Sequence, residues 1–243
     1  MTPILDVSGL TIRFGGLVAL SNVSFSIQPG EIVGLIGPNG AGKTTLFSSL
    51  VGLNRLNAGE IRFEGQKVDG LRPYRISRLG MTKTFQNTAL FPAMTLFENV
   101  VTAAAVRMPL REARAVARAC LEKVGMEDAG DTDVDDLTFP QKALGEVARA
   151  LATAPKILLL DEVMAALTPT EMDAVIATLR DLRSREGITL VIVEHHMRAI
   201  MQVSERILVL NFGQLIASGT PAEVSKNPDV ITAYLGQSDA SHS

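Results

Sequence analysis

Tryptophan is absent from this chain of 243 residues, and aromatic residues of all kinds make up only 5% of it. Cysteine occurs once, at Cys120, which excludes an internal disulfide and indicates core packing in a reducing compartment. No apolar run approaches the roughly 20 residues that cross a bilayer, and Asp6 and Arg13 bring charge to an amino terminus that has no apolar signal-peptide core. We therefore expect the chain by itself to be soluble.

A strongly basic surface is also missing, because the formal net charge is −3 at pH 7. This balance argues against a nucleic-acid partner. The arginines between positions 107 and 118 are expected to form the solvated face of a helix. With 47% hydrophobic residues, the chain can bury a substantial core. We expect a single domain over residues 1–243 that carries a smaller lobe.

What the chain does contain is a glycine-rich segment that matches the phosphate-binding pattern GxxxxGK[ST] at every fixed position. Its residues are Gly37, Pro38, Asn39, Gly40, Ala41, Gly42, Lys43, Thr44 and Thr45. The apolar run 32–36 before it predicts a buried strand, and residues 44–51 after it predict a helix. The alternative interpretation is a glycine-rich turn that binds no ligand. Such a turn would not require a buried strand before it and a helix after it.

A loop of this kind binds a nucleoside triphosphate because its backbone N–H groups and the following helix N-terminus face one concavity. We expect the Lys43 ammonium to contact the β- and γ-phosphates. The Thr44 hydroxyl is expected to bind Mg²⁺. The segment therefore predicts a site for a nucleoside triphosphate and its metal.

Acidic residues follow a second apolar strand, because Asp161 and Glu162 come directly after the leucines at 158–160. In a parallel sheet, ligands bind at the carboxyl ends of the strands. We expect Asp161 to hold Mg²⁺, directly or through water, and Glu162 to polarise a water molecule against the γ-phosphate. The alternative is that both residues merely start a loop.

A pair of histidines occupies the corresponding position after the apolar strand 189–193. A histidine at that strand end can reach a γ-phosphate, although adjacent histidines are also common on surfaces. Strands at 4–7, 10–14 and 24–27 predict an antiparallel layer, and the helical pattern from Thr95 to about Ala154 predicts an inserted helical lobe at about 90–155. The fold class is α/β, a P-loop NTPase core with a mostly parallel sheet.

Together these residues resemble the ATP-binding subunits of ABC transporters over nearly the whole chain. The resemblance implies that Phe14 stacks on adenine, although Phe14 is also compatible with plain strand core. It implies that Gln86 touches Mg²⁺ and the attacking water, that Glu162 is the catalytic glutamate and that His195 is the switch histidine. ATP and Mg²⁺ are the implied cofactors, and ATP hydrolysis is the implied activity.

The same resemblance implies the partners. A second ATP-binding subunit, either this chain or a paralogue, would form a head-to-tail dimer with it at the cytoplasmic face of the membrane. Integral membrane permease subunits would bind to that dimer, and a solute-binding protein would act indirectly. A soluble ABC protein of translation or DNA repair is disfavoured, because those usually join two nucleotide domains or carry long coiled coils.

Within the family, the chain is most similar to the ATPases of branched-chain (hydrophobic) amino-acid uptake systems. Three strings carry this similarity: 13–17, the Glu194-His195 form of the switch, and the ending 227–236. Other importers and lipopolysaccharide-export ATPases are the alternatives at this level.

One departure concerns the signature, which reads Leu-Ser-Gly-Gly-Gln in most members and 137-LTFPQ-141 here. In the family this segment contacts the γ-phosphate bound by the opposite subunit, so Thr138 and Gln141 are expected to serve ATP there. Pro140 has no backbone N–H, and one lost hydrogen bond to a charged acceptor costs about 1.5 to 3 kcal/mol. Thr138 and Gln141 also form a capping box for the next helix. A dimerising regulatory module with weak turnover is therefore the alternative function.

Overall fold

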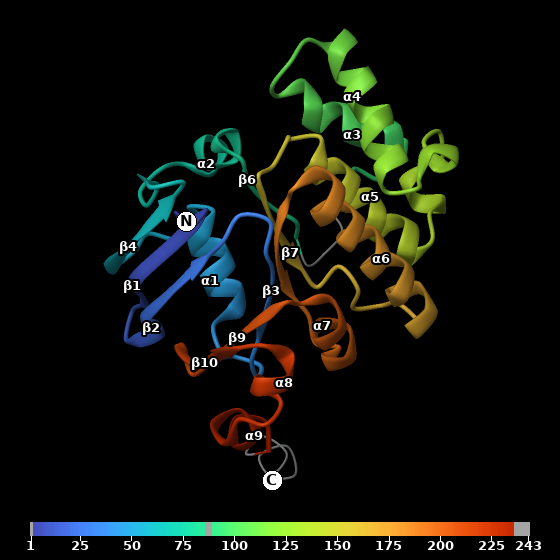
Figure 1. Ribbon diagram of the computed structural model, residues 1–243. Coiled ribbons are helices and arrows are strands. Elements are labelled where there is room, and N and C mark those ends of the chain that lie inside the picture. The colour runs from blue at the N-terminus through green and yellow to red at the C-terminus, as the bar shows by residue number, and fades with distance from the viewer. Residues whose placement is uncertain (1, 86–88, 236–243) are drawn as a thin grey trace.

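The fold contains two β-sheets, one in the middle of the molecule and one at its edge (Figure 1), in a computed structural model that describes residues 2–85 and 89–235. The first sheet is four-stranded and antiparallel, in the order β2-β1-β4-β5. The second is six-stranded, in the order β10-β9-β3-β8-β7-β6, and only β10 runs antiparallel to its neighbour. The strands are β1 (Leu5–Phe14), β2 (Leu17–Ile27), β3 (Ile32–Ile36), β4 (Ala58–Phe63), β5 (Gln66–Lys67), β6 (Met81–Lys83), β7 (Ile157–Asp161), β8 (Thr189–Val193), β9 (Arg206–Asn211) and β10 (Gln214–Gly219).

The helices include some that cover the two faces of the second sheet and others that form a separate lobe (Figure 1). They are α1 (Lys43–Leu50), α2 (Pro73–Leu79), α3 (Leu96–Ala105), α4 (Leu110–Lys123), α5 (Phe139–Leu151), α6 (Pro169–Glu186), α7 (Met197–Val203), α8 (Pro221–Val224) and α9 (Pro228–Leu235). The strands β3, β7 and β8 are buried at every residue. Such unbroken apolar strands are typical of a parallel sheet covered on both sides, so the predicted fold class is confirmed.

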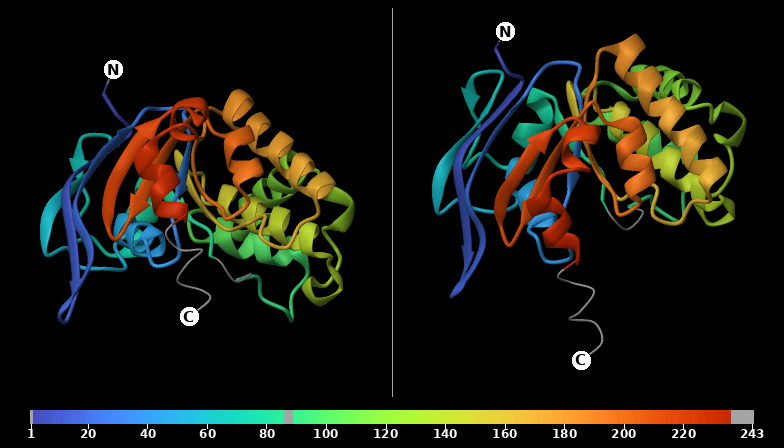
Figure 2. Two further views of the ribbon diagram at one scale, coloured as in Figure 1. Left: turned by 90° about the horizontal axis from the view of Figure 1, so that it is seen from below. Right: turned by 60° about the horizontal axis from the view of Figure 1, so that its bottom comes forward.

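Alternation along the strands divides the core in two. In β7, Ile157 and Leu159 belong to the core shared with the antiparallel sheet, whereas Leu158 and Leu160 belong to the core on the other face. Successive strand side chains point to opposite faces, so each strand serves both cores. Helix α1 supplies Phe47 to the first core and lies between the two sheets (Figure 2).

The antiparallel layer differs in detail from the prediction of three short strands. The strands predicted at 4–7 and 10–14 belong to the single strand β1, which begins at Leu5 and continues past Gly9 through irregular pairing with β2. Gly9 has a φ of 60°, a conformation that glycine adopts without strain. The strand predicted at 24–27 is only the end of β2. Its start escaped prediction because residues 17–20 are all apolar, so the alternation of apolar and polar residues that indicates a half-buried strand is missing there.

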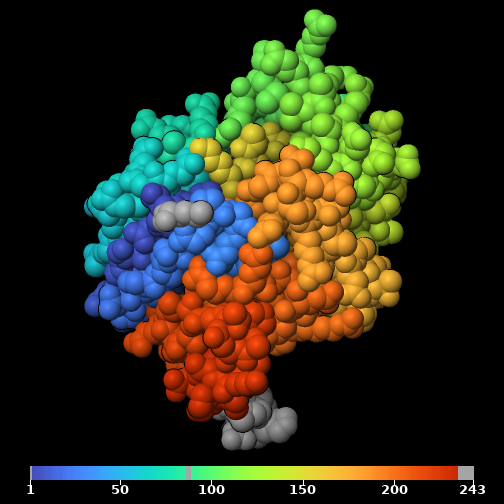
Figure 3. Space-filling model, viewed as in Figure 1, coloured from blue at the N-terminus to red at the C-terminus, as the bar shows by residue number. Residues whose placement is uncertain are grey.

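Helices α3, α4 and α5 pack against one another and form the predicted helical lobe, and its part around α3 and α4 stands out at the top of Figure 3 in green. The arginines of α4 (Arg111, Arg114 and Arg118) are exposed, as expected of a solvated face. Cys120 lies buried on the opposite face of α4, and burial raises the pKa of its thiol to about 11. The boundaries of the lobe, about 90–155, remain a proposal. Within residues 2–85 and 89–235, each helix is too short or too polar to cross a bilayer.

Candidate nucleotide-binding site

The glycine-rich loop connects β3 to α1, and two glycines allow its close packing. A Cβ atom on Gly37 would lie 2.1 Å from the Leu210 carbonyl oxygen, and one on Gly42 would lie 2.9 Å from the Ala19 carbonyl oxygen. Gly42 also has a φ of 104°, which disfavours other residues. The loop is therefore fixed between β2 and β9, with the N-terminus of α1 directly after it.

A cavity of about 460 Å³ opens above this loop. Its lining contains most of the residues predicted to bind nucleotide, together with both predicted catalytic residues of the described chain: Phe14, Asn39, Gly40, Ala41, Gly42, Lys43, Thr44, Thr45, Glu162 and His195. Sequence reasoning missed five further lining residues: Leu17, Val18, Ala19, Phe212 and Gly213. Leu17 and Val18 are apolar and exposed, a combination that only the structure reveals.

Lys43 lies at the floor of the cavity. Its Nζ donates hydrogen bonds to the carbonyl oxygens of Gly37 at 2.7 Å and Pro38 at 3.1 Å. Burial lowers the pKa of the Lys43 ammonium, and the carboxylates of Glu162 and Asp161 oppose this shift. The carbonyl groups of Gly37 and Pro38 therefore hold the ammonium of Lys43 in place. Neither Gly37 nor Pro38 is among the residues that line the cavity.

Asp161 ends β7 and is 1% exposed. Its Oδ2 lies 2.9 Å from the Nζ of Lys83 on β6, an ion pair that sequence reasoning missed. Its backbone N–H donates to the Thr84 hydroxyl at 3.1 Å. Oδ1 accepts no hydrogen bond from the described residues, although it is buried. A buried carboxylate oxygen without a donor is suited to a hard cation, so the donor set at Asp161 fits Mg²⁺.

Glu162 and His195 meet at the ends of two neighbouring strands. The His195 Nε2 lies 2.6 Å from the Glu162 Oε1, and the imidazole N–H donates to the carboxylate. Glu162 has a φ of 55° and donates its backbone N–H to the Val193 carbonyl at 2.9 Å. This unusual backbone conformation turns the carboxylate toward the cavity lining. His196 instead lies with its Nε2 3.3 Å from the Ala165 carbonyl.

Glu194 is a buried carboxylate that sequence reasoning treated only as a subfamily marker. Its Oε1 accepts a hydrogen bond from the Met164 backbone N–H at 2.7 Å, and its side chain is almost inaccessible. Burial raises the pKa of Glu194 to about 7, assisted by the nearby charges of Glu162 and Asp161 and opposed by backbone hydrogen bonds. Glu194 therefore links the end of β8 to the segment after Glu162.

The raised pKa of Glu194 predicts a pH dependence of stability. The folded protein holds this proton more tightly than the unfolded chain, so the free energy of unfolding falls as pH rises from about 4.5 to about 7. Glu194→Gln removes the titration and keeps the Oε1 acceptor. Its stability relative to the natural chain should rise by about 3 kcal/mol between pH 4.5 and pH 8, measured by urea denaturation. The exposed Glu122→Gln is the control, and equal pH profiles of all three proteins would contradict the prediction.

The signature segment lies at the start of α5, apart from the cavity lining as the described residues define it. The predicted capping box is confirmed: the Thr138 hydroxyl accepts from the Gln141 N–H at 3.4 Å, and the Gln141 Oε1 accepts from the Thr138 N–H at 2.9 Å. Pro140 lies in the first turn, and Phe139 is 69% exposed. Contact of Thr138 and Gln141 with ATP therefore remains a proposal about an opposite subunit. Gln86 lies outside the described residues.

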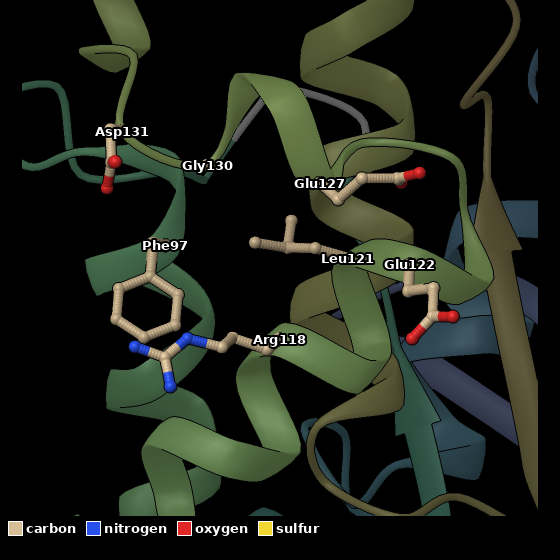
Figure 4. Close-up of a pocket in the computed structure, with 7 residues that line it drawn as sticks. All are labelled: Phe97, Arg118, Leu121, Glu122, Glu127, Gly130 and Asp131. Carbon is tan, nitrogen blue, oxygen red and sulfur yellow. The ribbon is translucent and has the colours of Figure 1, made fainter.

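A separate cavity of about 410 Å³ lies in the helical lobe. The Arg118 guanidinium lies over the Phe97 ring, 5.4 Å from its centroid, and the Glu122 and Glu127 carboxylates point away from that ring (Figure 4). This lining shares no residue with the predicted site. The chemistry expected from the sequence is concentrated at the carboxyl ends of β3, β7 and β8.

A P-loop, an acidic strand end and a histidine at the next strand end define a nucleotide-binding ATPase fold, and the sequence pattern of the ABC transporter family matches residues 20–165. The chain belongs to the ATP-binding proteins of ABC transporters. A second pattern, that of branched-chain amino acid ATP-binding cassette transporters, matches residues 214–240.

Known proteins agree with this assignment. The chain is 41% identical to the high-affinity branched-chain amino acid transport ATP-binding protein BraF of Pseudomonas aeruginosa, over 97% of this chain and 98% of that protein. A crystal structure of the ADP conformation of an ATP-binding cassette of an ABC transporter superposes with a TM-score of 0.90 at 28% identity, covering 97% of this chain and 100% of that one. A dimeric bacterial ABC transporter cassette superposes with a TM-score of 0.79 at 27% identity, covering 89% and 98%. The predicted family resemblance is confirmed.

Proposed function

We propose that the chain is the ATP-hydrolysing subunit of an importer for branched-chain or other hydrophobic amino acids. The observation that carries this proposal is the convergence of Lys43, Glu162 and His195 on one cavity in a chain 41% identical to a branched-chain amino acid transport ATPase. Two such subunits would form a head-to-tail dimer at the cytoplasmic face of the membrane. Their closure around ATP would drive separate permease subunits, which receive solute from a binding protein.

The geometry supports distinct roles in phosphoryl transfer to water. The loop amides and Lys43 would hold the phosphates, and Phe14 at the cavity edge would stack on adenine. Thr44 and Asp161 would hold Mg²⁺, with Gln86 as a further ligand, and the bound metal would neutralise charge on the β- and γ-phosphates. Glu162 would accept a proton from the attacking water. His195, which donates to Glu162, would orient that carboxylate and support the γ-phosphate.

Reconstitution tests the proposed transport function. The chain is co-expressed with candidate permease subunits and inserted with them into vesicles that contain ATP, and the solute-binding protein is added outside. Uptake of radiolabelled leucine should require ATP, the membrane proteins and the intact Lys43. ATP-dependent uptake of a different solute would keep the ATPase role and overturn the substrate class. Absence of ATP hydrolysis by the complete assembly would contradict the proposal that this chain is an ATPase.

The missing backbone N–H of Pro140 is the reason for the alternative function, a regulatory module with weak turnover. Pro140→Gly restores a backbone N–H in the first turn of α5 and should raise the rate of ATP hydrolysis by the assembled complex about tenfold to a hundredfold. Pro140→Ala restores the same N–H without the added flexibility of glycine, so both variants should gain equally. Steady-state phosphate release measures the effect. Rates equal to that of the natural chain would show that the missing N–H does not limit turnover.

A further inference from the structure

The position of Phe212 is unfavourable for the stability of the fold, both in its backbone conformation and in its exposure to solvent. The residues 212 and 213 form a two-residue turn between β9 and β10, and their φ values of 43° and 75° are both positive. Positive φ at both central residues is the pattern of a type I′ turn, which favours asparagine, aspartate or glycine at its first position. A bulky aromatic residue there strains the backbone. Burial does not compensate, because the Phe212 side chain is 82% exposed.

The turn that carries Phe212 is fixed against the phosphate-binding loop. The Gly213 N–H donates to the Ala41 carbonyl at 3.0 Å, and the Gly213 carbonyl accepts from the Ser21 N–H at 2.8 Å. A Cβ atom on Gly213 would lie 2.6 Å from the Ala19 carbonyl oxygen, so glycine is required for this close contact. The backbone next to Phe212 is therefore tied to both the loop and β2.

Phe212 belongs to an apolar rim of the nucleotide cavity. The exposed side chains of Phe14, Leu17, Val18 and Phe212 line one cavity together with the loop amides and Lys43. The amides and the ammonium suit phosphates, whereas the rim offers apolar and aromatic surface. A nucleotide that places its phosphates on the loop has only its ribose and base left for that rim. Aromatic side chains contact a base favourably because every base has a π-face.

We propose that Phe212 is a nucleobase-binding residue of the ATP site, which supplies a second aromatic surface besides Phe14. This inference rests on the proposed function, because it requires ATP in the cavity. It explains why the turn carries a strained, exposed aromatic residue at a position that asparagine would occupy with less strain. The strain is retained because the side chain acts on the ligand and not on the core.

Calorimetric titration of the purified chain tests the inference. Phe212→Ala should weaken ATP binding about tenfold and leave binding of tripolyphosphate, which has no base, unchanged. Phe212→Asn is the matched variant: it places the residue that the turn prefers, so its melting temperature should equal or exceed that of the natural chain while its ATP affinity falls equally. A melting temperature of Phe212→Asn that is kept or raised, together with a lower affinity for ATP, would indicate that Phe212 binds the ligand and does not stabilise the fold.

Fluorescence gives an independent measurement, because the chain contains no tryptophan. Phe212→Trp introduces a single reporter, whose emission should change with ATP and remain constant with tripolyphosphate at protein concentrations that keep the chain monomeric. Phe139→Trp, at an exposed position away from the cavity lining, should remain constant under both conditions.

Three results separate the possible failures. Equal ATP affinity of the natural chain, Phe212→Ala and Phe212→Asn would overturn the role of Phe212 and leave the proposed function standing. A fluorescence response of Phe212→Trp that appears only on dimerisation would assign the side chain to the partner subunit instead. Failure of the natural chain to bind either ATP or tripolyphosphate would overturn the proposed function itself.

Discussion

Glu162→Gln is expected to lower the steady-state rate of ATP hydrolysis by about two to four orders of magnitude and to leave the affinity for ATP within about twofold. Glutamine retains an oxygen that accepts the His195 hydrogen bond now made by the Glu162 Oε1 at 2.6 Å. It loses the capacity to take a proton from water at neutral pH. The substitution therefore separates binding from chemistry with little change in the geometry of the site.

The measurement is phosphate release by the complete assembly, with ATP affinity determined in parallel by calorimetry. Glu112→Gln, which removes a carboxylate from the exposed face of α4, serves as the control and should keep the full rate. Phosphate release by Glu162→Gln at the natural rate would remove Glu162 from the chemical step. The base would then have to be another group within reach of the γ-phosphate.

Lys43→Ala is expected to weaken ATP binding about a hundredfold or more. In the proposed role the ammonium would supply charge-assisted hydrogen bonds to two phosphates, each worth about 1.5 to 3 kcal/mol. No other lysine or arginine of the described chain lines the cavity. Hydrolysis should fall with binding. Calorimetry with ATP measures the loss, and the same experiment with the exposed Lys67→Ala gives the reference.

Stability provides the second readout for Lys43. Burial lowers the pKa of this ammonium, which shows that the fold disfavours its charge. Removing the charge should therefore leave the melting temperature near that of the natural chain, despite the loss of the hydrogen bonds to Gly37 and Pro38. An affinity equal to that of the natural chain would contradict the phosphate-binding role. A large loss of stability together with affinity would show that Lys43 is chiefly structural.

The sequence predicted the parts of the fold that follow from periodicity and from strong local patterns. Unbroken apolar strands predicted the parallel sheet, and the segment around Lys43 predicted the loop between β3 and α1. The capping box at Thr138 was predicted because its partner, Gln141, lies three residues away. In each case the physical cause is local, so a single chain contains the whole signal.

Features that depend on distant residues escaped prediction. The ion pair of Lys83 with Asp161 joins two strands that are neighbours only in the folded sheet. The rim residue Phe212 reaches the cavity because its hairpin packs on Ala41, far away in sequence. Glu194 carries a raised pKa because the fold buries it near other carboxylates. None of these contacts has a periodic or short-range signature.

The pairing of β7 with β8 has a consequence for how this protein tolerates change. Asp161 is paired with Val193 in the sheet, so Glu162 and Glu194 each follow directly after a residue of this last pair. Exchange of one branched aliphatic residue for another inside these strands leaves the pairing register of β7 and β8 unchanged. Insertion or deletion of a single residue in either strand would advance one chemical group past the other and turn apolar side chains to the wrong face. We therefore expect these two strands to tolerate exchanges among branched aliphatic residues and to tolerate no change in length.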